Sequence, residues 1–433
     1  MLVARNGAKD SLVVAGARVI DPTEGIDATL DVKVDDGTIS AIGTAVERNA
    51  HRVVDGSGLV LAPAFVDPHV HLRTPGREDE ETIASGTEAA AAGGYCAIVA
   101  MPNTEPVVDT AAVLQSLVER AHEEAVVPTG FTAAISKGQR GEELTEMAEL
   151  AAAGAIAFTD DGRPVVSAGL MRRALAYSAV ADRPLALHCE EPSLSSGGQM
   201  HEGRISAELG LTGWPSVAES LMVARDLALA AYEGRPVHLQ HLSATESVDA
   251  VRRARAAGVR VSAEASPHHL CTTDEVVRTL DANVKMNPPL RTEDDRRALV
   301  EGLLDGTIDC VATDHAPHAR HEKDAPFEEA PFGVIGLETA FAALNTFLVR
   351  TGEVPLATIL ERMSAGPARA LGLPVPRIAV GERANLVLLD LDSEWTVRED
   401  GFRSRSANSW LLGRTLTGAV VKTVADGRVV FAA

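Results

Sequence analysis

Eight strand-like runs, each followed by a polar loop and a helix-like stretch, dominate the middle of the chain. They cover residues 61–72, 95–101, 127–135, 155–159, 184–189, 237–242, 259–263 and 308–312. A regular alternation of strands and helices favours a parallel sheet with the helices packed outside it. Eight such units predict a (β/α)8 barrel of the TIM type, in which the chemistry gathers at the carboxyl ends of the strands.

Start and stop signals support the helices between these strands. The start signals place an acidic residue three positions after a hydroxyl residue, as in Ser216-x-x-Glu219, Ser243-x-x-Glu246 and Thr292-x-x-Asp295. The stop signals are the glycines Gly234, Gly258 and Gly306. We therefore expect capped helices at these places.

The two ends of the chain differ from the middle because both read as all-β. Short β-branched runs cover residues 12–20, 31–42 and 52–60 at one end and residues 384–391 and 418–431 at the other. Asp36-Gly37 and Asp426-Gly427 are two-residue hairpin signals within these runs. We expect a small composite β-sandwich domain made of residues 1–60 and 371–433, beside a barrel that spans residues 61–370.

Composition narrows the class of protein. The chain has 433 residues, of which 45% are hydrophobic and 23% charged, and these are globular values. Its formal net charge of -21 argues against nucleic acid and against anionic membrane surfaces as partners, although a few local cations could still bind an anionic substrate. The four cysteines are scattered, and the sequence shows neither a signal peptide nor a membrane-length apolar run. We expect a reduced, cytoplasmic protein.

His69 and His71 stand at the end of the first strand-like run. Side chains alternate along a strand, so the two imidazoles share one face about 6 to 7 Å apart and could close on one metal ion. An isolated His-x-His pair is more often two hydrogen-bonded polar residues. The rest of the chain must therefore supply further ligands.

Metal-competent residues do follow four more strand-like runs. They are Asp160 and Asp161 after the fourth, His188 after the fifth, His241 after the sixth and Asp314 after the eighth. Each alone could be a hydrogen-bonded core residue or a helix cap. Chance would scatter such residues over both ends of the strands, so their gathering at one end predicts a metal site.

Several longer motifs carry a family resemblance. They are His69-x-His71-x-Arg73 with Pro75-Gly76, Met101-Pro102-Asn103-Thr104, Thr159-Asp160-Asp161-Gly162, His188-Cys189-Glu190, Ser266-Pro267-His268-His269-Leu270, Lys285-Met286-Asn287-Pro288-Pro289-Leu290-Arg291, Ala312-Thr313-Asp314-His315-Ala316-Pro317-His318 and Ala330-Pro331-Phe332-Gly333. Together they resemble dihydroorotases, and more narrowly the long, type I form within the amidohydrolase superfamily. The resemblance covers nearly the whole chain.

The resemblance implies a site for two Zn2+ ions per chain. His69, His71 and Asp314 would hold one ion, His188 and His241 the other, and Asp161 would bridge them. Imidazole and carboxylate suit zinc. Many relatives bridge their metals with a carbamylated lysine, but residues 155–162 contain no lysine. Lys137, after the third run, remains a rival bridge, although a lysine on a surface loop is the more ordinary interpretation.

A small anionic substrate needs a planar donor in this acidic protein. Arg73, two residues beyond His71, suits a carboxylate, and its alternative role is an ion pair with Glu78 or Asp79. The resemblance adds His71, Asn103 and His318 to the substrate contacts. It also places the backbone of Asn287, Phe332 and Gly333 against the ring amide of dihydroorotate.

The resulting hypothesis is metal-assisted opening and closure of a cyclic amide, which interconverts N-carbamoyl-L-aspartate and L-dihydroorotate in pyrimidine (UMP) biosynthesis. Metal ions would polarise the ring carbonyl and lower the pKa of the attacking water towards about 7. Asp314 would be the catalytic group that accepts the proton and returns it to the leaving ring nitrogen. We expect a homodimer and consider an association with aspartate transcarbamoylase.

Two alternatives stay open. One is a hydantoinase or allantoinase on the same fold, against which Asp161 and the set Arg73, Asn103 and His318 argue. The other is a catalytically silent subunit that serves as a scaffold, against which the full set of metal ligands argues. No role is predicted for the remaining histidines of these motifs and their neighbours: His201, His238, His268, His269, His315 and His321.

Overall fold

The computed structural model describes residues 1–47 and 52–433, and parallel pairing joins the eight predicted barrel strands into one closed ring. Parallel pairing joins β6 (Phe65–Val70), β7 (Tyr95–Ala100) and β8 (Thr129–Phe131) on one side of the ring. On the other side β9 (Leu185–Leu187), β12 (Val237–Leu239), β13 (Val261–Ala265) and β14 (Cys310–Val311) pair in parallel.

Single bridges close the two gaps in this ring. Phe158 bridges in parallel to Ala133 and to Leu185, and Val70 bridges in parallel to His315. The fourth strand, predicted at residues 155–159, therefore has only one bridging position, Phe158. Backbone hydrogen bonds from Ile156 to Phe131 and from Thr159 to Ala133 extend its contact with the preceding strand. The predicted barrel is confirmed.

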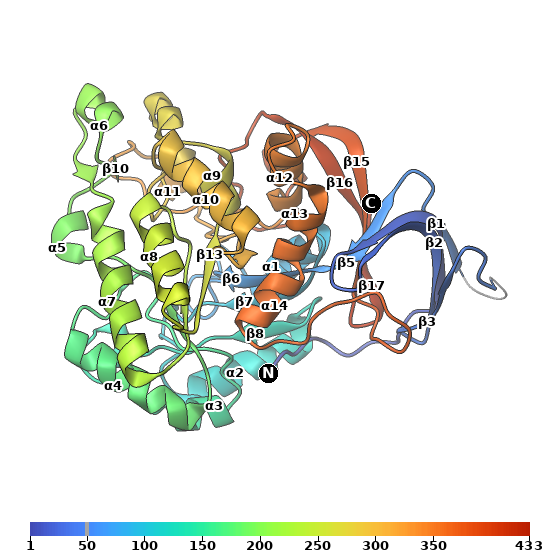
Figure 1. Ribbon diagram of the computed structural model, residues 1–433, viewed down its shortest axis with the longest axis horizontal. Helices are drawn as coiled ribbons and strands as arrows, with labels where there is room; N and C mark the ends of the chain where they lie inside the picture. Colours follow the sequence, from blue (N-terminus) through green and yellow to red (C-terminus); the bar gives the residue numbers. More distant parts are fainter. Residues whose placement is uncertain (48–51) are drawn as a thin grey trace.

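Helices surround the barrel and bury their apolar faces in its largest core (Figure 1). The longer helices are α1 (Ile83–Ala92), α2 (Ala111–Glu124), α4 (Ala168–Ala181), α7 (Val217–Glu233), α8 (Thr245–Ala256), α10 (Glu293–Asp305) and α13 (Leu356–Met363). Shorter ones are α3 (Met147–Ala152), α5 (Pro192–Ser195), α6 (Arg204–Leu209), α9 (Pro267–Cys271), α11 (Arg320–Lys323), α12 (Ala340–Leu344) and α14 (Ala365–Ala370). Single turns lie at η1 (Lys137–Gln139), η2 (Asp274–Thr279), η3 (Ala282–Val284), η4 (Asn345–Val349) and η5 (Glu399–Gly401).

Only one of the three predicted capping boxes forms. Thr292 and Asp295 cap α10 reciprocally, as expected. Ser216 makes no side-chain cap at α7, and α8 is preceded by Ala244 rather than by Ser243. These two predictions are wrong because Glu219 is used elsewhere: its carboxylate accepts hydrogen bonds from the backbone of Ser243 and Ala244 and so ties α7 to the loop before α8.

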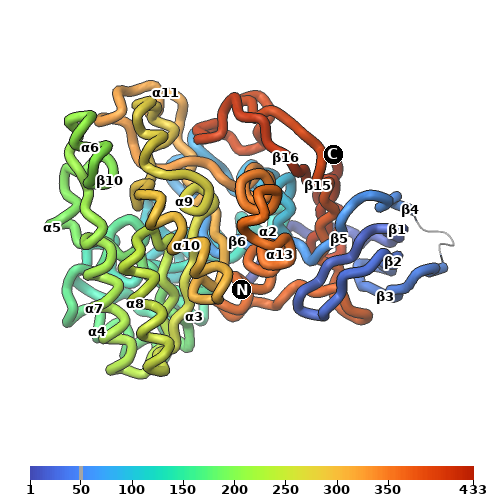
Figure 2. The backbone as a smooth tube through the Cα atoms, turned by 45° about the horizontal axis from the view of Figure 1, so that its top comes forward, coloured from blue at the N-terminus to red at the C-terminus, as the bar shows by residue number. Residues whose placement is uncertain are grey.

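Strands from both ends of the chain make one further sheet, in the order β17-β16-β15-β5-β1-β2-β3 with β4 paired to β1. These strands are β1 (Leu12–Asp21), β2 (Ile26–Asp35), β3 (Thr38–Gly43), β4 (Arg52–Asp55), β5 (Val60–Pro63), β15 (Leu386–Thr396), β16 (Thr415–Ala425) and β17 (Arg428–Ala432). Figure 2 shows the red C-terminal strands beside the blue N-terminal ones. Both predicted hairpins form, since β2 pairs with β3 and β16 with β17.

A small separate pair, β10 (Met200–His201) and β11 (Gly213–Trp214), lies in the loop region after β9. Within the described residues, no helix is long and apolar enough to cross a membrane.

Candidate metal centre

The end of β6 carries the first two candidate ligands into the centre of the barrel. His69 is fully buried and His71 is 6% exposed, and their ring centroids lie 5.3 Å apart. The Nε2 atoms of His69 and His71 lie 3.4 and 3.1 Å from Oδ1 of Asp314, which follows β14. The structure therefore brings the predicted group His69, His71 and Asp314 together.

His188 and His241 form a second group on the other side of Asp161. Their facing nitrogens, Nδ1 of His188 and Nε2 of His241, are 2.9 Å apart. Oδ1 of Asp161 lies 3.6 Å from His188, 3.7 Å from His241 and 3.5 Å from His69, while Oδ2 lies 3.6 Å from His71. The carboxylate of Asp161 therefore lies between the two groups, where a bridging ligand would have to be.

Hydrogen bonds fix which nitrogen of each ring faces this centre. His69 Nδ1 donates to Glu264 at 2.8 Å, His71 Nδ1 to Asn103 at 3.0 Å and His188 Nε2 to Glu190 at 3.0 Å. The opposite nitrogens of His69 and His71 face the carboxylates of Asp161 and Asp314, and that of His188 faces His241. Metal-binding histidines have this arrangement, in which an acceptor holds the far N–H and the near nitrogen binds the ion.

An unsatisfied buried atom shows that these residues fit a cation. His69 Nε2 is buried and makes no hydrogen bond within the described chain. Such an atom costs free energy unless a proton or a metal ion satisfies it. Four imidazoles and two carboxylates are the donor types that Zn2+ prefers. The residues present therefore fit a metal centre.

The charges of the cluster favour the same interpretation. Burial by itself would raise the pKa of Asp161, but the charge of His69 and a hydrogen bond with His241 hold that pKa well below its usual value. Burial likewise opposes ionisation of Asp314, and His69 and His71 nevertheless lower its pKa. Both carboxylates are therefore anionic, and the centre requires compensating positive charge.

Glu264, at the end of β13, holds two of the proposed ligands by hydrogen bonds, and this role was not predicted. Its side chain is fully buried and accepts hydrogen bonds from His69 Nδ1, from His238 Nε2 at 2.8 Å and from the His241 backbone at 3.2 Å. Burial would raise its pKa, but hydrogen bonds with His238 and His69 lower it to about 2. The sequence signal that could have identified Glu264 is a single charged residue at the end of the otherwise uncharged seventh strand.

Lys137 and most of the histidines that had no predicted role lie outside the metal centre. His238 reaches it only through Glu264, and His315 donates to Glu81. Lys137 forms an ion pair with Glu143, and its side chain is 41% exposed, so it cannot bridge metals here. His201 contacts Arg291 and His269 contacts Ser266, whereas the buried His268 lies near enough to Asp314 and His241 for their charges to act on its pKa. His321 is exposed.

A cavity of about 170 Å³ opens above the metal ligands. Its walls include every predicted substrate-contact residue: His71, Arg73, Asn103, Asn287, His318, Phe332 and Gly333. Asn103 also positions two of the proposed ligands, since its side-chain amide accepts a hydrogen bond from His71 and donates one to Asp161 at 3.1 Å. Asn287 donates to Glu190 at 3.4 Å.

Arg73 is the cation of this cavity, and its partner differs from the predicted alternatives. Its Nε lies 3.0 Å from the buried Glu80 and 3.0 Å from the carbonyl of Pro317. Neither Glu78 nor Asp79 pairs with it: Glu78 pairs with Arg120. Because Nε carries these contacts, they fix the plane of the guanidinium at the cavity wall.

The Phe332–Gly333 segment approaches the cavity as backbone. A Cβ on Gly333, whose φ is +121°, would come within 2.8 Å of Ala316, so only glycine allows this approach. Its N–H already donates to the Lys285 carbonyl at 2.9 Å, and His318 Nε2 donates to the Phe332 carbonyl at 2.8 Å. The Gly333 N–H is therefore not free to bind a substrate. The segment can instead accept hydrogen bonds from a substrate through the lone pairs of its backbone carbonyls.

Two buried lysines hold this segment without a carboxylate partner. Lys323 donates to the carbonyls of Pro331 at 2.8 Å and Ala282 at 3.0 Å. Lys285 donates to the carbonyls of Phe327 and Glu328, and its ammonium lies 4.6 Å from the centre of the Phe332 ring. Burial lowers the pKa of Lys323 to about 7 and that of Lys285 to about 8.

Known proteins resemble this chain over nearly its whole length. Residues 58–247 match a family model described as Dihydro-orotase-like. A dihydroorotase of Thermoanaerobacter sp. (strain X514) is 44% identical over 418 residues, 96% of each chain, and one of Geobacillus sp. (strain WCH70) is 46% identical over 409 residues, 94% of this chain and 96% of the relative.

Solved structures show the same fold at lower identity. An L-hydantoinase (dihydropyrimidinase) from Arthrobacter aurescens superposes with a TM-score of 0.87 at 26% identity, covering 98% of this chain and 96% of the other. A dihydropyrimidinase from Brevibacillus agri NCHU1002 gives 0.85 at 22% identity, with 98% and 95% covered. The fold is thus shared with a hydantoinase and a dihydropyrimidinase, while the higher sequence identity, 44% and 46%, is with dihydroorotases. This chain belongs to the dihydroorotase family of the amidohydrolase superfamily.

Proposed function

We propose that the protein interconverts N-carbamoyl-L-aspartate and L-dihydroorotate in pyrimidine biosynthesis. The observation that carries the proposal is the cavity of about 170 Å³, where Asp161, Asp314 and the imidazoles meet the guanidinium of Arg73. A cyclic amide that bears a carboxylate needs both halves of this site: a metal centre at the reacting carbonyl and a planar cation at the carboxylate.

The proposed cofactor is a pair of Zn2+ ions. His69, His71 and Asp314 would hold one ion, His188 and His241 the other, and Asp161, which lies between both groups, would bridge them. Zinc bound there would supply Lewis acidity and a water of lowered pKa.

Asp314 is the proposed catalytic proton carrier. It is buried at the cavity floor, and its lowered pKa keeps it ionised at neutral pH, so it can accept a proton. The same carboxyl group would return that proton to the ring nitrogen as the amide opens.

The substrate contacts are proposed from the cavity walls. Arg73, with Asn103 and His318, would bind the carboxylate. Burial lowers the pKa of His318 to about 3, with Arg73 and Lys323 contributing, so His318 is neutral and its one N–H, on Nε2, would have to turn from the Phe332 carbonyl to donate to the carboxylate. The backbone of Asn287, Phe332 and Gly333 would contact the ring amide, and the Phe332 carbonyl retains a lone pair for a ring N–H.

A hydantoinase remains the competing activity because the fold is shared with that enzyme class. The decisive assay compares dihydroorotate, hydantoin and allantoin as substrates of one preparation in which zinc is quantified. We expect turnover of dihydroorotate alone with about two zinc ions per chain. Faster turnover of hydantoin or allantoin would refute the proposed substrate. Zinc-replete protein without any turnover would favour a silent scaffold.

Further expectations belong to this proposal. We propose a homodimer that associates with aspartate transcarbamoylase, and a cytoplasmic location, which is supported by four free cysteine thiols. We also propose the division into a barrel at residues 61–370 and a composite domain from residues 1–60 and 371–433, of which residues 48–51 lie outside the described part. Size-exclusion chromatography with light scattering tests the dimer, and pull-down from the cytosol of the source cell tests the partner.

A further inference from the structure

A second, larger cavity lies at the opposite end of the barrel from the metal centre. Its volume is about 470 Å³, and it reaches Val66 at the beginning of β6, Ala97 in β7 and Pro128 just before β8. The metal ligands His69 and His71 follow at the other end of β6. The two cavities share no lining residue. A ligand in this cavity would therefore not touch the substrate.

Two hairpin turns pack against each other beside this cavity, and one of them contributes Asp426 to its lining. The turns are Asp36-Gly37 and Asp426-Gly427, and they pack so closely that a Cβ on Gly427 would lie 2.5 Å from the Gly37 Cα atom. Hydrogen bonds from Gly37 to Asp10 and from Asp10 to Gly427 lock the N-terminal segment onto both turns at 2.9 Å. The turn that carries Asp426 is therefore held in place before any ligand binds, which lowers the entropic cost of binding.

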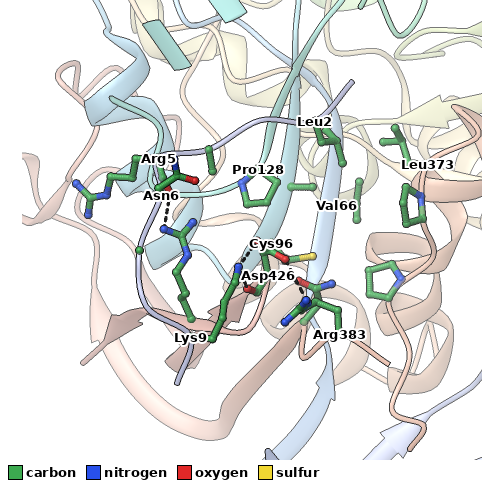
Figure 3. Close-up of a pocket in the computed structure, with 17 residues that line it drawn as sticks. Leu2, Arg5, Asn6, Lys9, Val66, Cys96, Pro128, Leu373, Arg383 and Asp426 are labelled. Carbon is green, nitrogen blue, oxygen red and sulfur yellow. Dashed lines mark hydrogen bonds and ion pairs between the residues drawn. The ribbon is translucent and has the colours of Figure 1, made fainter. Parts of the chain in front are cut away.

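One end of the cavity is strongly basic. Arg5, Lys9, Arg383 and Arg428 line it, against Asp426 as the one acidic lining residue. Asp426 contacts Lys9 at 2.5 Å and Arg383 at 3.5 Å (Figure 3). The lining therefore holds four cationic residues and one carboxylate, in a chain whose net charge is -21.

Arg428 is the least compensated of these cations. It is 8% exposed, it donates to the Arg5 carbonyl at 2.6 Å, and its Nε has no hydrogen-bond partner within the described residues. Burying a guanidinium is costly unless an anion accompanies it. An anionic ligand in the cavity would supply the missing charge.

The other end of the cavity is apolar. Leu2, Val66, Pro128 and Leu373 gather there, away from the charged groups (Figure 3). A volume of about 470 Å³ lies in the range of small-molecule sites. We propose that this cavity binds a small molecule in which a phosphate or carboxylate group is joined to a ring, with the anion at the arginines and the ring against the apolar end.

The test measures binding to the metal-loaded full chain by isothermal titration at low salt. The probes are uridine monophosphate, benzoate and inorganic phosphate, so that ring-bearing phosphate, ring-bearing carboxylate and the bare anion are separated. We expect one site per chain for at least one ring-bearing probe, with a dissociation constant below about 1 mM, and about tenfold weaker binding of inorganic phosphate. Saturating dihydroorotate should not displace the probe.

Two variants locate the site. Arg383→Gln changes a half-exposed residue and should weaken binding about tenfold without unfolding the protein, because it removes one charged contact. Arg428→Gln should do the same from the buried side. The matched control is Arg172→Gln, which also breaks a single exposed ion pair, with Glu233 on the barrel surface, and should leave binding unchanged.

Several results would overturn the proposal. They are the absence of saturable binding by all three probes up to about 10 mM, equal affinity in Arg383→Gln and the unaltered protein, and displacement of the probe by substrate. Equal affinity for inorganic phosphate and the ring-bearing probes would refute the role of the apolar end.

Discussion

Replacement of Glu264 by glutamine tests whether the centre binds metal as proposed. The side chain accepts two imidazole N–H groups at 2.8 Å, from His69 and His238, and the His241 backbone N–H at 3.2 Å. Glutamine keeps the shape but has one acceptor oxygen and no charge. One of the two imidazoles must then turn or lose its partner.

The expected cost follows from these contacts. A hydrogen bond to a charged acceptor is worth about 1.5 to 3 kcal/mol, and a residue that orients a metal ligand typically contributes 10- to 100-fold to metal affinity. We therefore expect Glu264→Gln to weaken zinc binding by about 10- to 100-fold, or about 1.4 to 2.7 kcal/mol. Turnover at limiting zinc should fall in parallel and recover in part when zinc is added.

The assay is a competition titration of zinc against a chelator of known affinity, with circular dichroism to establish that the variant is folded. Glu301→Gln, on the exposed face of α10, is the matched control and should bind zinc normally. A folded Glu264→Gln protein with zinc affinity within about twofold of the unaltered protein would refute the argument that Glu264 orients the ligands.

Four further perturbations probe the cavity and the fold. Asp314→Asn should leave a folded protein whose turnover is lower by about 10²- to 10⁴-fold in both directions, and near-normal turnover with bound metal would exclude its role in proton transfer. Arg73→Lys should raise KM about tenfold because an ammonium cannot bind a carboxylate with two parallel hydrogen bonds, whereas an unchanged KM would remove Arg73 from the carboxylate site. Lys323→Met removes the hydrogen bonds to Pro331 and Ala282 and should raise KM more than it lowers kcat, unlike Lys137→Met at the surface; a KM equal in the two variants would contradict this. Burial raises the pKa of Glu338 from 4.5 to about 7, so the folded state binds this proton more tightly than the unfolded state does, and the resulting stability is lost as the pH rises from about 4.5 through 7. The melting temperature of Glu338→Gln should not show this loss. Parallel profiles of melting temperature against pH for the variant and the unaltered protein would contradict the prediction.

Residues near one another in sequence were well predicted because their geometry is local. The period of a strand places His69 and His71 on one face, and the end of each strand decides which loop residue faces the barrel mouth. The same logic brought Asp161, His188, His241 and Asp314 to one place. Local rules failed where a distant residue competed, as when Glu219 bonded to the loop at Ser243 instead of capping α7.

The sequence by itself therefore determined the barrel, the composite sheet and the set of candidate ligands, since these follow from periodicity, turn signals and recurring motifs. Only the tertiary structure decided their partners. Glu264 lies 195 residues from the imidazole of His69 that it holds, and Lys323 fixes carbonyls that no pattern marks. The basic cavity depends on Lys9 and Arg428 meeting from opposite ends of the chain. Such pairings arise from packing over long sequence separations, which the order of residues does not display.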